Sequence, residues 1–241
     1  MKAFMLGAGT GTRLRPLTDT VPKCLVPIQG TPLLAIWFEL CRLHGIREVL
    51  INLHYLPEVV RAFIGSRDWG LRIRTVWEPT LLGSAGTVAM NRSFVAGEKR
   101  FFILYLDNLT NVDLTAMAAD HDARDGCLTM GLFRTGNPRG CGIVRLDDEG
   151  RVEAFSEKPE APDSDLANAG VYVASEALFD DIPAHVPCDF GAHVLPRLVG
   201  RMHGYLIDGY LRDIGTPEDY RSAQTGWPGV PSLMSQARKV R

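Results

Sequence analysis

A glycine-rich turn directly after the first apolar run is the feature that most constrains the fold. Residues 3–6 are typical of a β-strand, and the next five positions, 7–11, contain three glycines. Glycine has no Cβ, so such a turn can bend sharply and bring its backbone close to a ligand. Its successive N–H groups would form a donor surface for phosphate oxygens. Arg13 supplies a planar guanidinium group and Lys23 an ammonium group on a flexible stem. The segment therefore predicts a triphosphate-binding loop at the end of a strand.

Two familiar phosphate-binding loops do not match this turn. A P-loop requires Gly-Lys followed by Ser or Thr after its spacer, whereas Gly11 is followed by Thr12 and Arg13. The dinucleotide-binding fingerprint needs a different glycine spacing and an uninterrupted helix. Pro16 would interrupt that helix. The turn therefore belongs to neither class.

Composition limits the remaining possibilities. A chain of 241 residues with 46% hydrophobic residues can bury the core of one large domain, and a net charge of −2 argues against a nucleic-acid partner. No apolar run reaches the length of about 18 residues needed to cross a membrane, and the apolar N-terminal run is too short for a secretory signal. The five cysteines are scattered without a Cys-x-x-Cys pair, and the six histidines show no metal-ligand spacing. We therefore expect a cytoplasmic protein without a zinc site or disulfide framework, whose histidines are structural or exposed.

Strand-like and helix-like segments alternate over the first half of the chain. Residues 1–125 predict a parallel sheet with helices on both faces, from strands at 48–53, 71–77 and 101–106 and helices at 31–44, 59–64 and after 86. The second half predicts a mixed extension of the sheet, with little helix between strands at 127–133, 141–147, 151–156 and 168–174. We expect a single α/β domain over 1–224, with two halves, 1–125 and 126–224. Residues 225–241 show no core pattern and are predicted to be a tail.

The glycine-rich turn resembles a family signature. The residues from Gly9 through Arg13, Leu14, Pro16, Leu17 and Thr18 to Pro22-Lys23 match the Gly-x-Gly-Thr-Arg-Leu-x-Pro-Leu-Thr…Pro-Lys motif of sugar-1-phosphate nucleotidyltransferases. The resemblance covers roughly residues 1–222 with five ordered motifs. It implies that the domain over 1–224 is catalytic, with a nucleotide-binding half (1–125) and a sugar-binding half (126–224). It implies a Rossmann-like, mixed and mostly parallel sheet of the nucleotide-diphospho-sugar transferase (GT-A-like) type. It also implies a nucleotide-binding set of Leu6, Gly7, Ala8, Gly9, Thr10, Gly11, Thr12, Arg13 and Lys23.

Two aspartates are the candidate metal ligands. Asp107 follows the apolar strand at 101–106, where open α/β sheets place their ligands, and Asp213 precedes a helix start. Two carboxylates beside triphosphate oxygens suit Mg²⁺, and the resemblance implies that acids in these two motifs hold it. The family usually has glycine before the first aspartate, whereas this chain has Leu106. We expect that side chain to crowd the backbone next to the metal.

Two further sets of candidates depend on the resemblance. The turn at 82–87 would by itself be an ordinary strand-to-helix loop; the family uses such an element to contact nucleobase and ribose, which implicates Gly83, Ser84, Gly86 and the preceding Glu78. Likewise, Glu-Lys-Pro and Asn-Ala-Gly segments form the sugar-phosphate site of the family. They implicate Gly142, Glu157, Lys158, Asn168 and Gly170 as sugar-binding residues.

The resemblance implies an enzyme that joins an NTP to a sugar 1-phosphate and releases pyrophosphate, with Arg13, Lys23 and Lys158 as catalytic residues. Segments 167–170, 189–191 and 205–210 look most like short guanylyltransferases, which favours GTP with mannose or heptose 1-phosphate. Uridylyl or thymidylyl transfer to a hexose 1-phosphate, CTP with a non-sugar phosphate, and a non-catalytic nucleotide-sugar-binding regulatory subunit stay open, as does a homodimer. A glycosyltransferase would need an Asp-x-Asp motif, which residues 107–109 do not supply.

Overall fold

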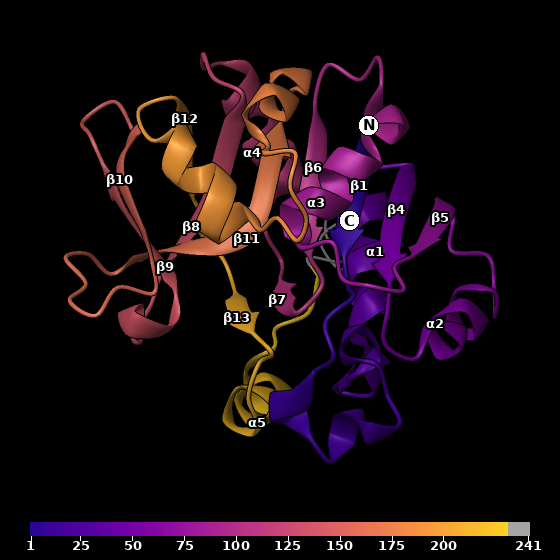
Figure 1. Ribbon diagram of the computed structural model, residues 1–241. Coiled ribbons are helices and arrows are strands. Elements are labelled where there is room, and N and C mark those ends of the chain that lie inside the picture. The colour runs from indigo at the N-terminus through magenta and orange to yellow at the C-terminus, as the bar shows by residue number, and fades with distance from the viewer. Residues whose placement is uncertain (231–241) are drawn as a thin grey trace, which may run out of the picture.

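A nine-stranded sheet forms the centre of the computed structural model, in which residues 1–230 are described (Figure 1). Four strands of the first half are parallel neighbours, in the order β6 (Phe101–Tyr105), β1 (Lys2–Leu6), β4 (Glu48–Leu53) and β5 (Arg72–Trp77). Helices α1 (Leu33–Leu43), α2 (Pro57–Ile64) and α3 (Ser84–Met90) lie between these strands in the chain. This half confirms the predicted alternation of strand and helix.

The second half extends the sheet with antiparallel pairs. The long strand β11 (Leu166–Ala174) lies antiparallel to β6 and continues the sheet beyond it. The other strands of this half are β8 (Leu128–Arg134), β9 (Gly142–Leu146), β10 (Val152–Glu157) and β12 (Met202–Leu206). Strands β9 and β10 stand at the opposite edge from β5 (Figure 1). The predicted mixed extension is confirmed, and the strand predicted at 101–106 is parallel to one neighbour only.

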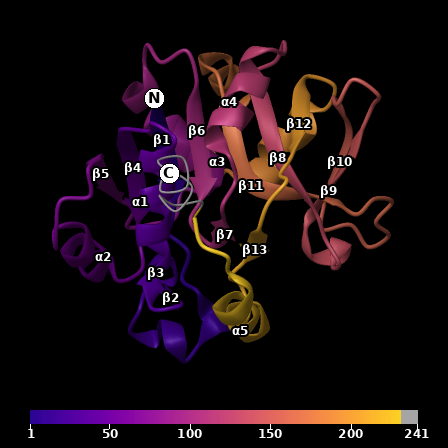
Figure 2. The same cartoon turned by 180° about the vertical axis from the view of Figure 1, so that it is seen from behind.

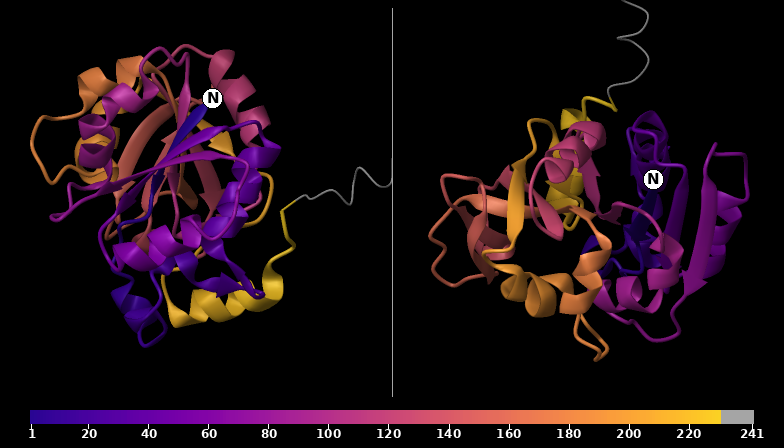
Figure 3. Two further views of the ribbon diagram at one scale, coloured as in Figure 1. Left: turned by 90° about the vertical axis from the view of Figure 1, so that its right-hand side faces the viewer. Right: turned by 90° about the horizontal axis from the view of Figure 1, so that it is seen from above.

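Alternation along the strands divides the core into two layers. In β6, Phe102 and Leu104 belong to the cluster that contains Trp37 of α1, whereas Phe101 and Ile103 belong to the cluster on the other face. The first cluster also holds residues of α4 (Leu114–Asp122). The second holds residues of α3 and of the helical turns at 176–198. Helices thus cover both faces of the sheet (Figure 3), because successive strand side chains point to opposite faces.

Two small sheets lie beside the main one. Strand β7 (Asn108–Thr110), directly after β6, pairs antiparallel with β13 (Leu211–Asp213). Strand β2 (Pro27–Ile28) pairs with β3 (Thr31–Pro32), and helix α5 (Pro217–Gly226) lies beside this hairpin (Figure 2). The carbonyl of Pro27 accepts hydrogen bonds from side chains of α5, at 3.1 Å and 2.8 Å. These contacts attach the last helix to the N-terminal half.

The predicted tail differs from the structure over its first residues. Trp227 and Val230 are 7% and 9% exposed and belong to the core cluster of α1. Gln29 Nε2 donates a hydrogen bond to the Trp227 carbonyl at 3.0 Å. Isolated apolar residues among prolines and glycines carry no periodic signal, so the sequence did not indicate this packing. The rest of that prediction, 231–241, lies outside the described residues.

No helix within residues 1–230 has the length and apolarity needed to cross a bilayer. All five cysteines carry free thiols.

Candidate active site

The loop after β1 presents unpaired backbone donors. Gly11 adopts a left-handed conformation with φ of 65°, and its carbonyl accepts a hydrogen bond from Thr18 Oγ1 at 2.7 Å. A Cβ at this position would lie 3.3 Å from the Cβ of Lys23, so both conformation and space require glycine. Within residues 1–230, the N–H groups of residues 8–11 donate no hydrogen bond to the protein. They are therefore free to bind the oxygens of an anion.

Lys23 joins the two predicted metal ligands. Its Nζ lies 2.9 Å from Asp107 Oδ2 and 3.5 Å from Asp213 Oδ1. Asp107 follows β6 and Asp213 ends β13, and the N–H of Ile214 donates to the Asp107 carbonyl at 2.8 Å. The pairing of β13 with β7 thus brings together two acids that are far apart in the chain.

The electrostatics of this acid pair favour a cation. Burial raises the pKa of Asp213, the neighbouring charge of Asp107 raises it further, and Lys23 and Arg13 oppose both effects. Two carboxylates that converge on one ammonium group offer the hard oxygen ligands that Mg²⁺ prefers. The residues present therefore fit a divalent cation at this point.

Leu106 does not crowd the backbone as expected, because it fits beneath the loop after β1. Its side chain is 1% exposed, and a Cβ added to Gly7 would lie 2.8 Å from its Cδ1. The Leu106 N–H donates to the Leu6 carbonyl at 3.0 Å, which continues the pairing of the two strands. The room that the leucine needs is thus provided by the missing side chain of Gly7, and Asp107 still reaches Lys23.

The second glycine turn is held by a loop from the other half of the chain. Gly83 has φ of 78°, and a Cβ there would collide with the Cys188 carbonyl, lying 2.7 Å from its carbon. The same carbonyl oxygen accepts the N–H groups of Ala85 at 2.8 Å and Gly86 at 2.9 Å. Ser84 donates from its N–H and its hydroxyl to Asp189 Oδ1, at 3.0 Å and 3.2 Å. These donors are therefore used within the protein, and the turn forms a wall of the site.

Glu78 lies in a buried hydrogen-bond network at the same wall. The residue is 3% exposed. Its Oε1 accepts from Asn52 Nδ2 at 3.0 Å and from Thr87 Oγ1 at 2.6 Å, and its Oε2 accepts from the Leu82 N–H at 3.2 Å. Asn52 Oδ1 in turn accepts from the Gly7 N–H at 2.9 Å. This network connects the predicted phosphate-binding loop, residues 7–11, to the predicted base-binding turn at 82–87.

Asn52 and Asp189 are two residues of this region that the sequence analysis did not select. Asn52 stands near the carboxyl end of β4, next to β1, and a polar residue at such a position was a usable signal. Asp189 begins the segment 189–191 that contributed to the resemblance, but nothing in that segment indicated that its carboxylate binds the turn at 82–87.

Two cavities meet at Asp107. One, of about 420 Å³, has Gly9, Glu78, Gly83 and Ser84 among its lining residues. The other, of about 510 Å³, is lined by all five predicted sugar-binding residues, namely Gly142, Glu157, Lys158, Asn168 and Gly170, and also by Asp213. Residues lining both cavities are Ser84, Tyr105, Asp107 and Asp189. The structure therefore gathers most of the predicted site residues around one continuous space. The predicted site residues that line neither cavity are Gly7, Thr10, Gly11, Thr12, Arg13, Lys23 and Gly86.

Glu157 is central to the larger cavity. Cβ atoms added to Gly142 and Gly191 would lie 2.9 Å and 2.6 Å from Glu157 Oε2, so the two glycines leave room for this carboxylate. Lys158 Nζ lies 3.8 Å from Glu157 Oε1 and its side chain is 65% exposed. Asn168 is held by Tyr172, whose hydroxyl accepts from Asn168 Nδ2 at 2.7 Å. The cavity thus combines an exposed cation with a carboxylate and a hydrogen-bonded amide group.

Comparison with known proteins identifies the family. A sequence profile described as nucleotidyl transferase matches residues 2–227. The chain belongs to the nucleotidyl transferase family.

Two curated relatives show the range of names in this family. A mannose-1-phosphate guanylyltransferase of Mycobacterium tuberculosis is 37% identical over 226 residues, which cover 90% of this chain and 62% of the relative. A UTP–glucose-1-phosphate uridylyltransferase of Synechocystis is 31% identical over 258 aligned positions, gaps included. The match covers 99% of this chain and 65% of the relative. The chain thus spans less than two thirds of the length of these relatives.

A solved structure shares the fold. The crystal structure of HddC from Yersinia pseudotuberculosis, complexed with GMP-PN, superimposes with a TM-score of 0.77 at 22% identity. The match covers 92% of this chain and 97% of that chain. The expected nucleotidyltransferase type of α/β fold is therefore confirmed.

One loop brings two histidines close to a cysteine. His185, Cys188 and His193 place a possible ligand atom each within 4.8 Å of the others. Their short spacing in the sequence does not follow the Cys-x-x-Cys pattern, and the prediction that the histidines are structural or exposed stays a prediction.

Proposed function

We propose that this chain transfers a guanylyl group from GTP to a sugar 1-phosphate, with mannose or heptose 1-phosphate as the favoured acceptor. The observation that carries the proposal is the meeting of the two cavities at Asp107, beside Lys23 and Asp213. A nucleotide on the side of the phosphate loop and a sugar phosphate on the side of Lys158 would bring their phosphates together there. The name of the mycobacterial relative supports the choice of substrates.

The proposed reaction is a direct displacement at phosphorus. An oxygen of the sugar 1-phosphate attacks the α-phosphorus of GTP and forms the new P–O bond. The bond from the α-phosphorus to the bridging oxygen breaks, and its electron pair leaves with pyrophosphate. Such a transfer needs no covalent enzyme intermediate, so positioning and charge neutralisation can supply most of the catalysis.

In the proposed complex, the loop after β1 and the side chains of Arg13, Lys23 and Lys158 bind the phosphate groups of the two substrates. The free N–H groups of residues 8–11, together with Arg13, bind the phosphates that become pyrophosphate. Lys23 reaches toward the α-phosphate from its place between the acids. Lys158, which is exposed at the larger cavity, holds the attacking phosphate against the repulsion of the triphosphate.

Asp107 and Asp213 are the proposed ligands of Mg²⁺. When bound, the ion would neutralise negative charge at the α-phosphate. Glu157 and Asn168, which line the larger cavity, would form hydrogen bonds with sugar hydroxyls, and Gly142 would line the sugar site while leaving room for the Glu157 carboxylate. The proposed location is the cytoplasm. Whether the chain forms a homodimer is left open.

Pyrophosphate release is the experiment that tests this function. The protein would be assayed with Mg²⁺ and each of GTP, UTP, dTTP and CTP, paired with mannose, heptose and glucose 1-phosphates. We expect the highest kcat/KM with GTP and abolished release in Asp107→Ala. Asp163→Ala removes an exposed carboxylate of a surface ion pair and serves as the matched control.

The other outcomes of this assay decide between the alternatives. Preference for UTP with glucose 1-phosphate would replace the guanylyltransferase by a uridylyltransferase, as the Synechocystis relative is named, and preference for dTTP would replace it by a thymidylyltransferase. Nucleotide binding without release for any pair would replace the enzyme by a regulatory subunit.

A further inference from the structure

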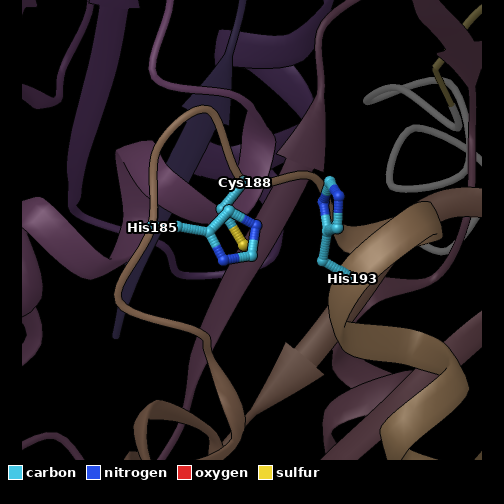
Figure 4. Close-up of side chains that lie close together, drawn as sticks. All are labelled: His185, Cys188 and His193. Carbon is cyan, nitrogen blue, oxygen red and sulfur yellow. The ribbon is translucent and has the colours of Figure 1, made fainter.

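His185, Cys188 and His193 form a compact group in a single loop, outside the acid pair of the active site. Their possible ligand atoms all lie within 4.8 Å of one another. In Figure 4 the His185 imidazole overlaps the Cys188 side chain, and the His193 imidazole lies to one side, carried by the helical turn that follows the loop. The two rings meet edge to face with centroids 4.9 Å apart.

The donor set selects a class of cation. Two imidazole nitrogens and one thiolate sulfur suit Zn²⁺ and similar borderline metals, whereas Mg²⁺ prefers oxygen ligands. Three protein ligands leave one tetrahedral position for water or another small ligand. Burial is graded across the group, since Cys188 is fully buried, His193 half-buried and His185 exposed. An ion could thus enter from the side of His185 and reach the sulfur.

We propose that His185, Cys188 and His193 bind one Zn²⁺-like divalent cation, and that this cation fixes the loop that lines the cavity of about 420 Å³. The proposal goes beyond the proposed transfer reaction and does not depend on it.

Backbone hydrogen bonds of Cys188 connect the proposed metal site to the turn at 82–87. The Cys188 carbonyl accepts the N–H groups of Ala85 and Gly86, and the Cys188 N–H donates to the Leu82 carbonyl at 2.8 Å. Pro187 and Asp189, the neighbours of Cys188, both line the cavity of about 420 Å³. A ligated Cys188 would hold its own backbone in place and with it the turn at 82–87.

One hydrogen bond must be exchanged for the cation. The Asp189 N–H donates to His193 Nδ1 at 2.9 Å. A neutral imidazole that accepts at Nδ1 carries its proton on Nε2, so neither nitrogen can ligate a metal while this bond persists. Metal binding therefore releases the Asp189 N–H, and the exchange of this amide with solvent reports on occupancy.

Co²⁺ is the probe for the test, because it adopts zinc geometry and shows a thiolate charge-transfer band. The full chain would be freed of metals and titrated with Co²⁺ in the presence of excess Mg²⁺. We expect one Co²⁺ per chain with a thiolate band that Zn²⁺ removes and Mg²⁺ does not. Amide exchange should become slower at Ala85 and Gly86 and faster at Asp189.

Variants identify the ligands. Cys188→Ser should abolish the band, and His185→Ala, at an exposed position that leaves folding unaffected, should weaken binding by at least about tenfold. Cys127→Ser removes a half-buried thiol outside the group and should leave the titration unchanged. A titration without a thiolate band, or a band that persists at full affinity in His185→Ala, would overturn the proposal. Neither readout involves pyrophosphate release, so failure of this proposal is distinguishable from failure of the proposed function.

Discussion

Lys23 Nζ lies 2.9 Å from Asp107 Oδ2, with the lysine side chain 10% exposed and the aspartate 40% exposed. The ammonium group also approaches Asp213 at 3.5 Å, so one buried cation separates two carboxylates. This arrangement places positive charge where the proposed reaction develops negative charge, and it keeps the two acids together without an ion.

Replacement of Lys23 by methionine should impair transfer far more than folding. Lys23→Met keeps the length of the side chain but removes the charge, and loss of one group aimed at transition-state charge costs about 10²–10³-fold in kcat. Pyrophosphate release measures the effect. Lys99→Met removes an exposed lysine, 75% accessible, from an ion pair with Asp122 and should leave kcat unchanged. Equal kcat values for the wild type and Lys23→Met would contradict the role of Lys23.

Asp213 should make the protein less stable as the pH rises. Burial, and then the charge of Asp107, raise the pKa of Asp213 above its ordinary value of 3.8. The folded protein therefore holds this proton more tightly than the unfolded chain, so stability declines as the pH rises from about 3.8 through the folded pKa. Asp213→Asn should raise Tm at pH 7, and the difference should disappear below pH 3.8. Thermal unfolding across this range would contradict the argument if Asp213→Asn lowered Tm at pH 7.

The sequence predicted the fold because its signals are local. Apolar runs such as 101–106 define strands, and a strand buried on both faces is apolar at every position. The acids of the site were equally predictable. Asp107 follows such a strand, and Asp213 occurs in a motif of a known family, so neither prediction required knowledge of the packing.

Contacts between distant loops were not predictable in the same way. Gly83 and Cys188 touch because two loops fold onto one another, and no periodicity in either segment encodes that meeting. The network of Asn52, Glu78 and Thr87 likewise depends on side chains from separate elements. The glycine at 83 could be interpreted as a turn signal, but the carbonyl that requires it could not be identified from the sequence.

Gly83→Ala should destabilise the protein through two effects. The positive φ of 78° disfavours any side chain, and the added Cβ would meet the Cys188 backbone. Together they should lower the free energy of unfolding by about 3 kcal/mol, as measured by urea denaturation. Gly97→Ala is the matched control, because Gly97 has the same φ of 78° with nothing within 4 Å of its Cβ position. That variant should lose only about 1 kcal/mol from backbone strain. Equal losses of unfolding free energy in both variants would mean that the Cys188 loop moves aside for the added methyl group at little cost.

Gly7 and Leu106 should show strong energetic coupling. Gly7→Ala alone would place a Cβ 2.8 Å from Leu106 Cδ1, and such overpacking costs about 1–3 kcal/mol. Leu106→Ala alone would leave a cavity beneath the loop, which costs about 2–5 kcal/mol for a buried leucine. In the double variant the alanine at 106 makes room for the methyl group at 7, so the loss in the free energy of unfolding should fall short of the sum by at least about 1 kcal/mol. Gly9→Ala combined with Leu106→Ala provides the comparison, because no atom lies within 4 Å of the Cβ position of Gly9. That pair should be additive within about 0.5 kcal/mol. Additivity in both cycles would show that Leu106 does not occupy the space left by Gly7.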